Sequence, residues 1–191
     1  MKVLKMNSFK VLTSVSLSIL LLLSSCAESD KKGKVETKVA TPKTTIQTAV
    51  LTNNLEVVKQ HIAAGTDLNV KDQMTGSTPL ITAVVFGKTA IVKTLIEANA
   101  DLSIKNNDGA TALHNAAFFG NVEMTQILMD AKADKNIKNN FGATARESVL
   151  VPFKTMEPVY KMMKQQLEPM GLNMDLVEIE KNRPVIAKML Q

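Results

Sequence analysis

The sequence is poor in the residues that most often carry chemistry. Its 191 residues include one cysteine, two histidines, one tyrosine and no tryptophan. A single thiol cannot form an intramolecular disulfide, and it excludes cysteine-based metal sites and thiol-pair redox chemistry. Glycine-rich phosphate loops, a serine nucleophile elbow, HExxH and CxxC are also absent from the sequence. We therefore expect no enzyme, no bound metal and no cofactor.

An apolar run long enough to span a bilayer is missing too. The stretch Val11–Leu23 has 13 residues, whereas a membrane-spanning helix needs about 20. Three lysines precede it and a Ser-Ser-Cys motif follows it at 24–26, an order of basic, apolar and small residues that is typical of a signal peptide. We expect residues 1–25 to be such a signal, and a retained transmembrane anchor is the alternative.

The only cysteine lies where this signal would be cleaved. Leu23-Ser24-Ser25-Cys26 resembles the bacterial lipobox, in which the cysteine is lipidated and becomes the first residue of the mature protein. The resemblance implies that acyl chains on Cys26 anchor the protein to a membrane. We then expect it in the bacterial cell envelope, on the periplasmic or outer face of the outer membrane. The other interpretation is a solitary cysteine that happens to lie near a cleavage site.

The mature chain would carry little net charge. The full sequence has a formal charge of +5, and removing residues 1–25 takes away three lysines and no acid, which leaves +2. Recognition of nucleic acid needs a concentrated basic face, so we expect no nucleic-acid partner. Residues 26–43 are charged and rich in threonine without an apolar period, which predicts a disordered tether.

A repeat of fixed length follows the tether. Thr78, Thr111 and Thr144 are 33 residues apart, and a glycine lies two positions before each of them. A period in this range indicates stacked supersecondary units that bury their apolar residues against one another. Two units share the pattern G-x-T-[PA]-L-[IH]-x-A, at 76–83 and 109–116, followed by a glycine, an apolar helix and an [NK]-A-D turn.

This pattern resembles the ankyrin repeat. The resemblance implies an all-α fold, a solenoid of helix-turn-helix units joined by β-hairpin-like loops. We expect about four units over 44–153, with the first and last acting as caps, at 44–75, 76–108, 109–141 and a degenerate 142–153. A helical capping segment is expected over 154–191, with helices at 159–167, 173–181 and 184–190. In this tail Asn173 is the expected N-cap of a helix and Pro184 a first helical residue.

Neither histidine has a partner for catalysis at a matched spacing. His114 occupies the Thr-Pro-Leu-His position of the family, where the resemblance implies a side-chain hydrogen bond that ties neighbouring loops together. His61 lies at a core position of the first unit. A terminal repeat tolerates a polar residue there because its outer side faces water.

The resemblance also implies where a partner protein would bind. In ankyrin-repeat proteins the loop tips and the exposed end of each first helix meet partners. The candidate partner-binding residues here are Met74, Val85, Phe86, Lys105, Asn107, Asp108, Phe118, Phe119, Lys138, Asn140 and Phe141. A row of phenylalanines among them would suit a binding hot spot. Alternatively, these rings pack against the adjacent unit or the C-terminal tail.

Together these features predict a monomeric module that is anchored in the cell envelope and binds an unknown partner protein. A second possibility is an inhibitor or immunity protein against a toxin or hydrolase. A third is a copper-handling protein, because thioethers are soft metal ligands and six methionines gather toward the C-terminus. They are Met156, Met162, Met163, Met170, Met174 and Met189. Methionine is equally a flexible filler for irregular packing.

Overall fold

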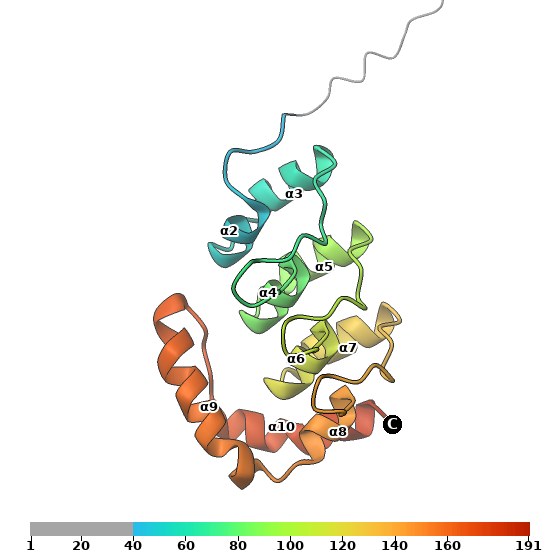
Figure 1. Cartoon of the computed structure of the whole chain (residues 1–191), viewed down its shortest axis with the longest axis vertical. Helices are drawn as coiled ribbons and strands as arrows, with labels where there is room; N and C mark the ends of the chain where they lie inside the picture. Colours follow the sequence, from blue (N-terminus) through green and yellow to red (C-terminus); the bar gives the residue numbers. More distant parts are fainter. Residues whose placement is uncertain (1–39) are drawn as a thin grey trace, which may run out of the picture. The chain divides into compact units, whose positions relative to one another are not determined.

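The computed structural model describes residues 40–191, which are entirely helices and loops without a strand (Figure 1). The predicted signal peptide, Cys26 and nearly all of the predicted tether lie outside the described residues. The helices are α2 (Ile46–Leu51), α3 (Leu55–Ala63), α4 (Pro79–Val85), α5 (Thr89–Glu97), α6 (Ala112–Phe118), α7 (Val122–Asp130), α8 (Ala145–Leu150), α9 (Phe153–Leu167), the 3₁₀ turn η1 (Glu168–Met170) and α10 (Leu176–Met189). Across residues 40–191 no helix has the length and apolar character needed to cross a membrane.

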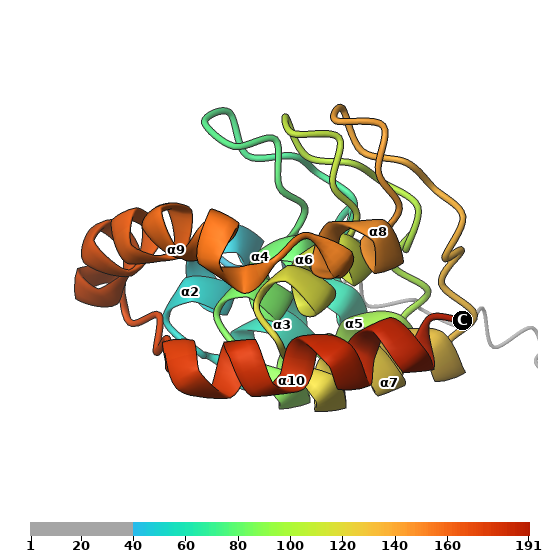
Figure 2. The same ribbon diagram turned by 90° about the horizontal axis from the view of Figure 1, so that it is seen from below.

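Three helix pairs, α2–α3, α4–α5 and α6–α7, stack as the predicted units. Their first helices form one row and their second helices another, and long loops project from the stack on one side (Figure 2). Each first helix begins after a threonine whose side-chain oxygen accepts a hydrogen bond from a backbone N–H of the first turn. These N-caps are Thr45, Thr78, Thr111 and Thr144. The repeated threonine therefore marks the start of each unit.

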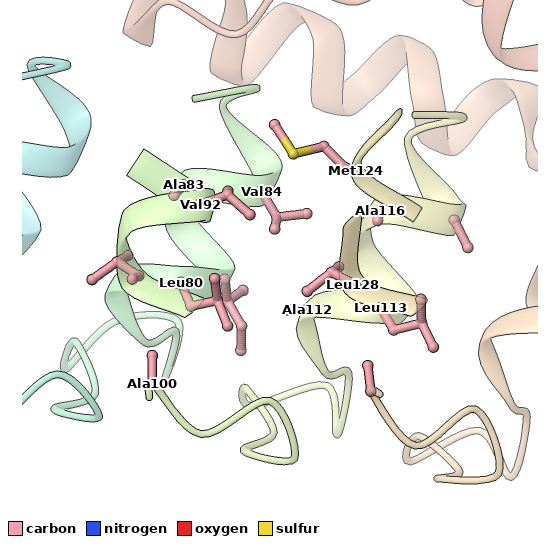
Figure 3. Packing of buried hydrophobic residues seen from close by; sticks show 14 of the residues in the cluster. Leu80, Ala83, Val84, Val92, Ala100, Ala112, Leu113, Ala116, Met124 and Leu128 are labelled. Atoms are coloured by element: carbon pink, nitrogen blue, oxygen red, sulfur yellow. The ribbon is translucent and has the colours of Figure 1, made fainter. Parts of the chain in front are cut away.

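The apolar core runs through the stack without interruption. Leu80 and Leu113 of the first helices are almost completely buried, and so are Leu95 and Leu128 of the second helices. Figure 3 shows the residues of the α4–α5 pair facing those of the α6–α7 pair. Because these side chains fill the space between neighbouring pairs, no single pair could bury them alone.

The fourth unit takes its second helix from the end of the chain. After α8, the first helix of this unit, the chain leaves the stack as α9 and η1 and returns as α10, which lies in the row of second helices beside α7 (Figure 2). Ile186, Ala187 and Leu190 of this terminal segment are buried in the main core. The tail therefore completes the last unit and covers its apolar side, as a capping element of a solenoid must.

Within the tail, the predicted helix boundaries are wrong. The helix expected at 159–167 begins at Phe153 and continues through Pro158. The two helices expected at 173–181 and 184–190 are one helix, α10, with Asp175 as its N-cap and Pro184 inside it. Proline removes one hydrogen bond from a helix interior. Ile179, before Pro184, is buried in a second apolar cluster, and Ile186, after it, is buried in the main core. Burial on both sides of the proline keeps the helix continuous.

The histidine of the first unit does not face water. His61 is buried, its Nε2–H donates to the Thr44 carbonyl at 2.7 Å, and its Nδ1 lies 3.0 Å from the Thr66 hydroxyl. A buried polar ring is tolerated when both of its nitrogens have partners. His61 thus joins the residues that precede α2 to the turn that follows α3.

Candidate partner-binding surface

Each loop between two units has one residue at its projecting tip. The three equivalent tip residues are Met74, Asp108 and Phe141. The backbone N–H of each tip residue donates to a side-chain oxygen two residues earlier, at 2.9–3.0 Å. The accepting side chains are those of Asp72, Asn106 and Asn139. The Met74 residue is 88% exposed and Phe141 is 81% exposed. Two of the three tips therefore present a large apolar side chain to solvent.

Three other predicted partner-binding residues link neighbouring loops. The side-chain amide of Asn107 donates to the Met74 carbonyl at 3.0 Å, and that of Asn140 donates to the Asn107 carbonyl at 2.8 Å. The Lys105 ammonium donates to the Lys138 carbonyl, also at 2.8 Å. These side chains have an internal role that the sequence analysis did not assign. The signal that could have shown it is the 33-residue spacing of the two asparagines.

His114 ties adjacent loops as the family resemblance implied. Its ring is buried, its Nε2–H donates to the Ala143 carbonyl at 3.1 Å, and its Nδ1 accepts from the Thr111 backbone N–H at 3.3 Å. Burial lowers the pKa of this histidine, the hydrogen bond to Ala143 opposes that shift, and the charge of Lys105 adds to it. The imidazole is therefore neutral at pH 7 and serves the fold.

This histidine makes stability depend on pH. In the unfolded chain His114 takes up a proton around its ordinary pKa of 6.5, whereas the folded ring does so only at lower pH. Between the two values the unfolded state binds more protons, so the free energy of unfolding falls as pH decreases below 6.5. Denaturant titrations on both sides of that pH measure the effect. His114→Gln is the control, and an equal pH dependence in both proteins would count against this assignment.

The predicted row of phenylalanines is covered by the C-terminal tail. Phe86, Phe118 and Phe119 are half-buried against a second apolar cluster, formed by Tyr160, Leu172, Met174 and Ile179. The Phe118 ring lies 5.3 Å from that of Phe119 and 4.6 Å from that of Tyr160, measured between centroids. Of the two interpretations that the sequence left open, packing against the tail is the one found. Val85 belongs to the same contact. Replacing these phenylalanines with serine would disturb the packing of the tail. Such substitutions therefore cannot separate a loss of partner binding from a loss of structure.

A buried arginine holds the tail in place. Arg183 is 3% exposed, and its Nη1 donates to the Tyr160 hydroxyl at 2.7 Å. Its Nη2 donates to the carbonyls of Ser148, at 3.3 Å, and Val151. The Tyr160 hydroxyl in turn donates to the Phe118 carbonyl at 2.7 Å. Burial raises the pKa of this tyrosine, and the Arg183 charge opposes the shift. The guanidinium thus supplies donors to carbonyls that the end of α8 leaves without intrahelical partners.

A second arginine completes a reciprocal arrangement. Arg146, which stands where the second and third units have a core leucine, donates through Nε to the Ala187 carbonyl near the end of α10 at 3.1 Å. Each of the two helices therefore provides an arginine for carbonyls of the other. The sequence analysis assigned a role to neither arginine. For Arg183 the available signal was its position four residues after Ile179 and three before Ile186, which places it on the same face of one helix as these apolar residues.

The methionines of the tail mainly fill space. Met156 and Met163 pack against the Tyr160 cluster, Met174 is buried within it, and Met189 packs against the main core. Among residues 40–191 no group of three or more His, Cys, Asp or Glu side chains is placed to hold a metal ion. This packing is what a flexible thioether provides in an irregular interface.

Comparison with known proteins confirms the ankyrin-repeat fold. Residues 46–139 match a family model described as ankyrin repeats in three copies. Among solved structures, the chain is similar to the ankyrin repeat domain of Bcl-3, a member of the IkappaB protein family, with 28% sequence identity and a TM-score of 0.53. The match covers 54% of this chain and 45% of the Bcl-3 chain, so this chain spans less than half of that length. No curated protein matched.

Proposed function

We propose that this chain, whose residues 46–139 match the ankyrin-repeat family model, binds a partner protein through the concave face of its solenoid. By concave face we mean the side formed by the first helices and the loops that project from them (Figure 2). Ankyrin repeats typically mediate protein–protein interactions and are generally not enzymes. The fold itself names no partner, so the proposal depends on the surface.

The exposed loop tips carry this proposal. Met74 and Phe141 occupy equivalent tip positions, and neither side chain belongs to the two apolar clusters that hold the fold together. Burying an apolar side chain of this size contributes roughly 1.5–3 kcal/mol. Aromatic side chains and methionine are enriched at protein interfaces. Met74 and Phe141 are therefore large apolar side chains outside the two clusters, at the loop tips where a partner protein could contact them.

Helix α9 widens the same face. Lys164 donates to the Met174 carbonyl at 2.7 Å, on the side of α9 that faces the start of α10. At about 100° per residue, Val159 and Met162 lie on the flank of the helix opposite Lys164. Both side chains are exposed. We include this apolar flank in the proposed surface, across the first helices from the loop tips.

A site-specific crosslinking experiment tests the surface. We expect a photoreactive residue at position 74 or at 141 to crosslink a discrete partner in the native envelope. Phe141→Ser should weaken the product formed from position 74, and Met74→Ser should weaken the product formed from position 141. Val177 on α10 is 76% exposed and lies outside the concave face, which makes Val177→Ser and crosslinking from 177 the matched controls. The same products from all three positions would contradict the proposal. A toxin or hydrolase as the captured protein would identify an inhibitor or immunity factor.

We further propose that Cys26 anchors this module to the envelope as a lipoprotein, with the outer membrane as its location and a monomer as its working form. The support is the lipobox-like segment around Cys26 and the small-residue cleavage site before it. Cys26→Ser is expected to abolish incorporation of a palmitate analogue and to release the protein into the soluble fraction. Unchanged labelling of the variant would refute lipidation at this residue.

Copper handling gains no support from the fold. Four of the six methionines toward the C-terminus are engaged in apolar packing, and only Met162 and Met170 are exposed. A Cu(I) site needs thioethers that converge on one point. The packed methionines instead share their contacts with aromatic and aliphatic side chains.

A further inference from the structure

Methionines are concentrated in the segment that covers the phenylalanine row. Five lie between positions 156 and 174, whereas residues 40–155 contain three. The five are Met156, Met162, Met163, Met170 and Met174. This segment comprises α9, η1 and the connection to α10, and its apolar side contacts Phe86, Phe118 and Phe119.

The accessibility of these thioethers is graded. Met162 is 51% and Met170 56% exposed, and neither belongs to an apolar cluster. Met156 and Met163 are half-buried at the edge of the Tyr160 cluster, where solvent can reach them and where they also contribute packing. Met174 is buried. Only Met156 and Met163 combine access for a small reagent with a role in holding α9.

Helix α9 can separate from the repeats without opening their core. No residue of α9 belongs to the main apolar core, whereas α10 contributes Ile186 and Ala187 to it. The contacts of α9 with the repeats and with α10 include the Tyr160 cluster, the Tyr160–Arg183 and Tyr160–Phe118 hydrogen bonds, and the Lys164 hydrogen bond to Met174. The helix is therefore held by one small cluster and three hydrogen bonds, and it contributes two half-buried methionines to that cluster.

We propose that Met156 and Met163 are sites of oxidation to methionine sulfoxide, and that their oxidation releases α9 from the phenylalanine row. Hydrogen peroxide transfers one oxygen atom to each sulfur: the O–O bond breaks, an S–O bond forms, the sulfur loses two electrons and water leaves. The product is polar and reversible by methionine sulfoxide reductases. An oxidised side chain without a hydrogen-bond donor in this cluster disfavours the docked state. Release uncovers Phe86, Phe118 and Phe119.

The only tyrosine of the chain reports the state of α9 directly. Tyr160 is completely buried in the docked state, and the sequence contains no tryptophan. After peroxide treatment of the full chain, we expect increased acrylamide quenching of tyrosine fluorescence. In an alkaline titration, the raised pKa of the Tyr160 phenol should fall toward the ordinary value of 10.0. Mass spectrometry identifies the oxidised residues, and sulfoxide reductase should restore the original signal.

Two pairs of substitutions separate release from general damage. Met156→Leu with Met163→Leu preserves apolar volume and is expected to abolish the peroxide response. Met162→Leu with Met170→Leu removes the exposed thioethers of this segment and should respond like the parent chain. Met156→Gln with Met163→Gln should release Tyr160 without peroxide while helical circular dichroism remains nearly unchanged. Persistence of the buried tyrosine signal when both Met156 and Met163 are oxidised overturns the proposal, and so does release in the first leucine variant.

Discussion

Arg183→Met is expected to lower the free energy of unfolding by about 3–5 kcal/mol. Methionine keeps the apolar stem of the side chain but removes the donors to Tyr160, Ser148 and Val151. A hydrogen bond from a charged group contributes roughly 1.5–3 kcal/mol, and an acceptor left buried without a donor adds its desolvation cost. Because the three bonds share one guanidinium, their contributions do not add. Urea unfolding followed by circular dichroism measures the loss.

The reciprocal arginine provides the control for this substitution. Arg146 is half-buried and makes one hydrogen bond, to Ala187. Arg146→Met should therefore cost no more than about 1–2 kcal/mol. Tyrosine fluorescence should change in the Arg183 variant and not in the Arg146 variant, because only Arg183 contacts Tyr160. Equal losses from the two substitutions would show that Arg183 does not organise the tail.

Gly120→Ala is expected to lower the free energy of unfolding by about 2–5 kcal/mol. Gly120 has φ +65°, in the left-handed region, and a Cβ there would lie 2.8 Å from the Ile179 Cα. The left-handed backbone costs a non-glycine residue about 1–2 kcal/mol. The remainder comes from displacing α10, because a backbone atom cannot turn away as the end of a side chain can. The Asn182 hydrogen bond to the Gly120 carbonyl, 3.0 Å long, would be strained as well.

Gly87 allows these two costs to be separated. It occupies the equivalent turn one unit earlier with φ +66°, and nothing lies within 4 Å of the position its Cβ would take. Gly87→Ala should therefore cost only the backbone term, about 1–2 kcal/mol. The difference between the variants in chemical denaturation measures how closely α10 docks. Identical losses would mean that α10 does not press against the turn.

The repeating part of the fold could be predicted from local sequence alone. Thr78 and Thr111 recur because each unit needs an N-cap, and Gly109 recurs because its φ of +72° favours glycine. Such requirements are local, they act again in every unit, and their fixed spacing is visible without coordinates. The hydrogen bond by which His114 links adjacent loops could be predicted in the same way, because the Thr-Pro-Leu-His position of the repeat implied it.

Tertiary structure decided what happens after the last complete unit. Pro158 and Pro184 mark helix boundaries in local sequence, yet both lie inside helices because flanking side chains such as Tyr160 and Ile186 are buried. The same limit applies to the phenylalanines. The local sequence around Phe118 is the same whether a partner protein or the chain's own tail covers the ring. Only the return of α9 and α10, over contacts far apart in sequence, distinguishes the two and leaves Met74 and Phe141 as the exposed candidates.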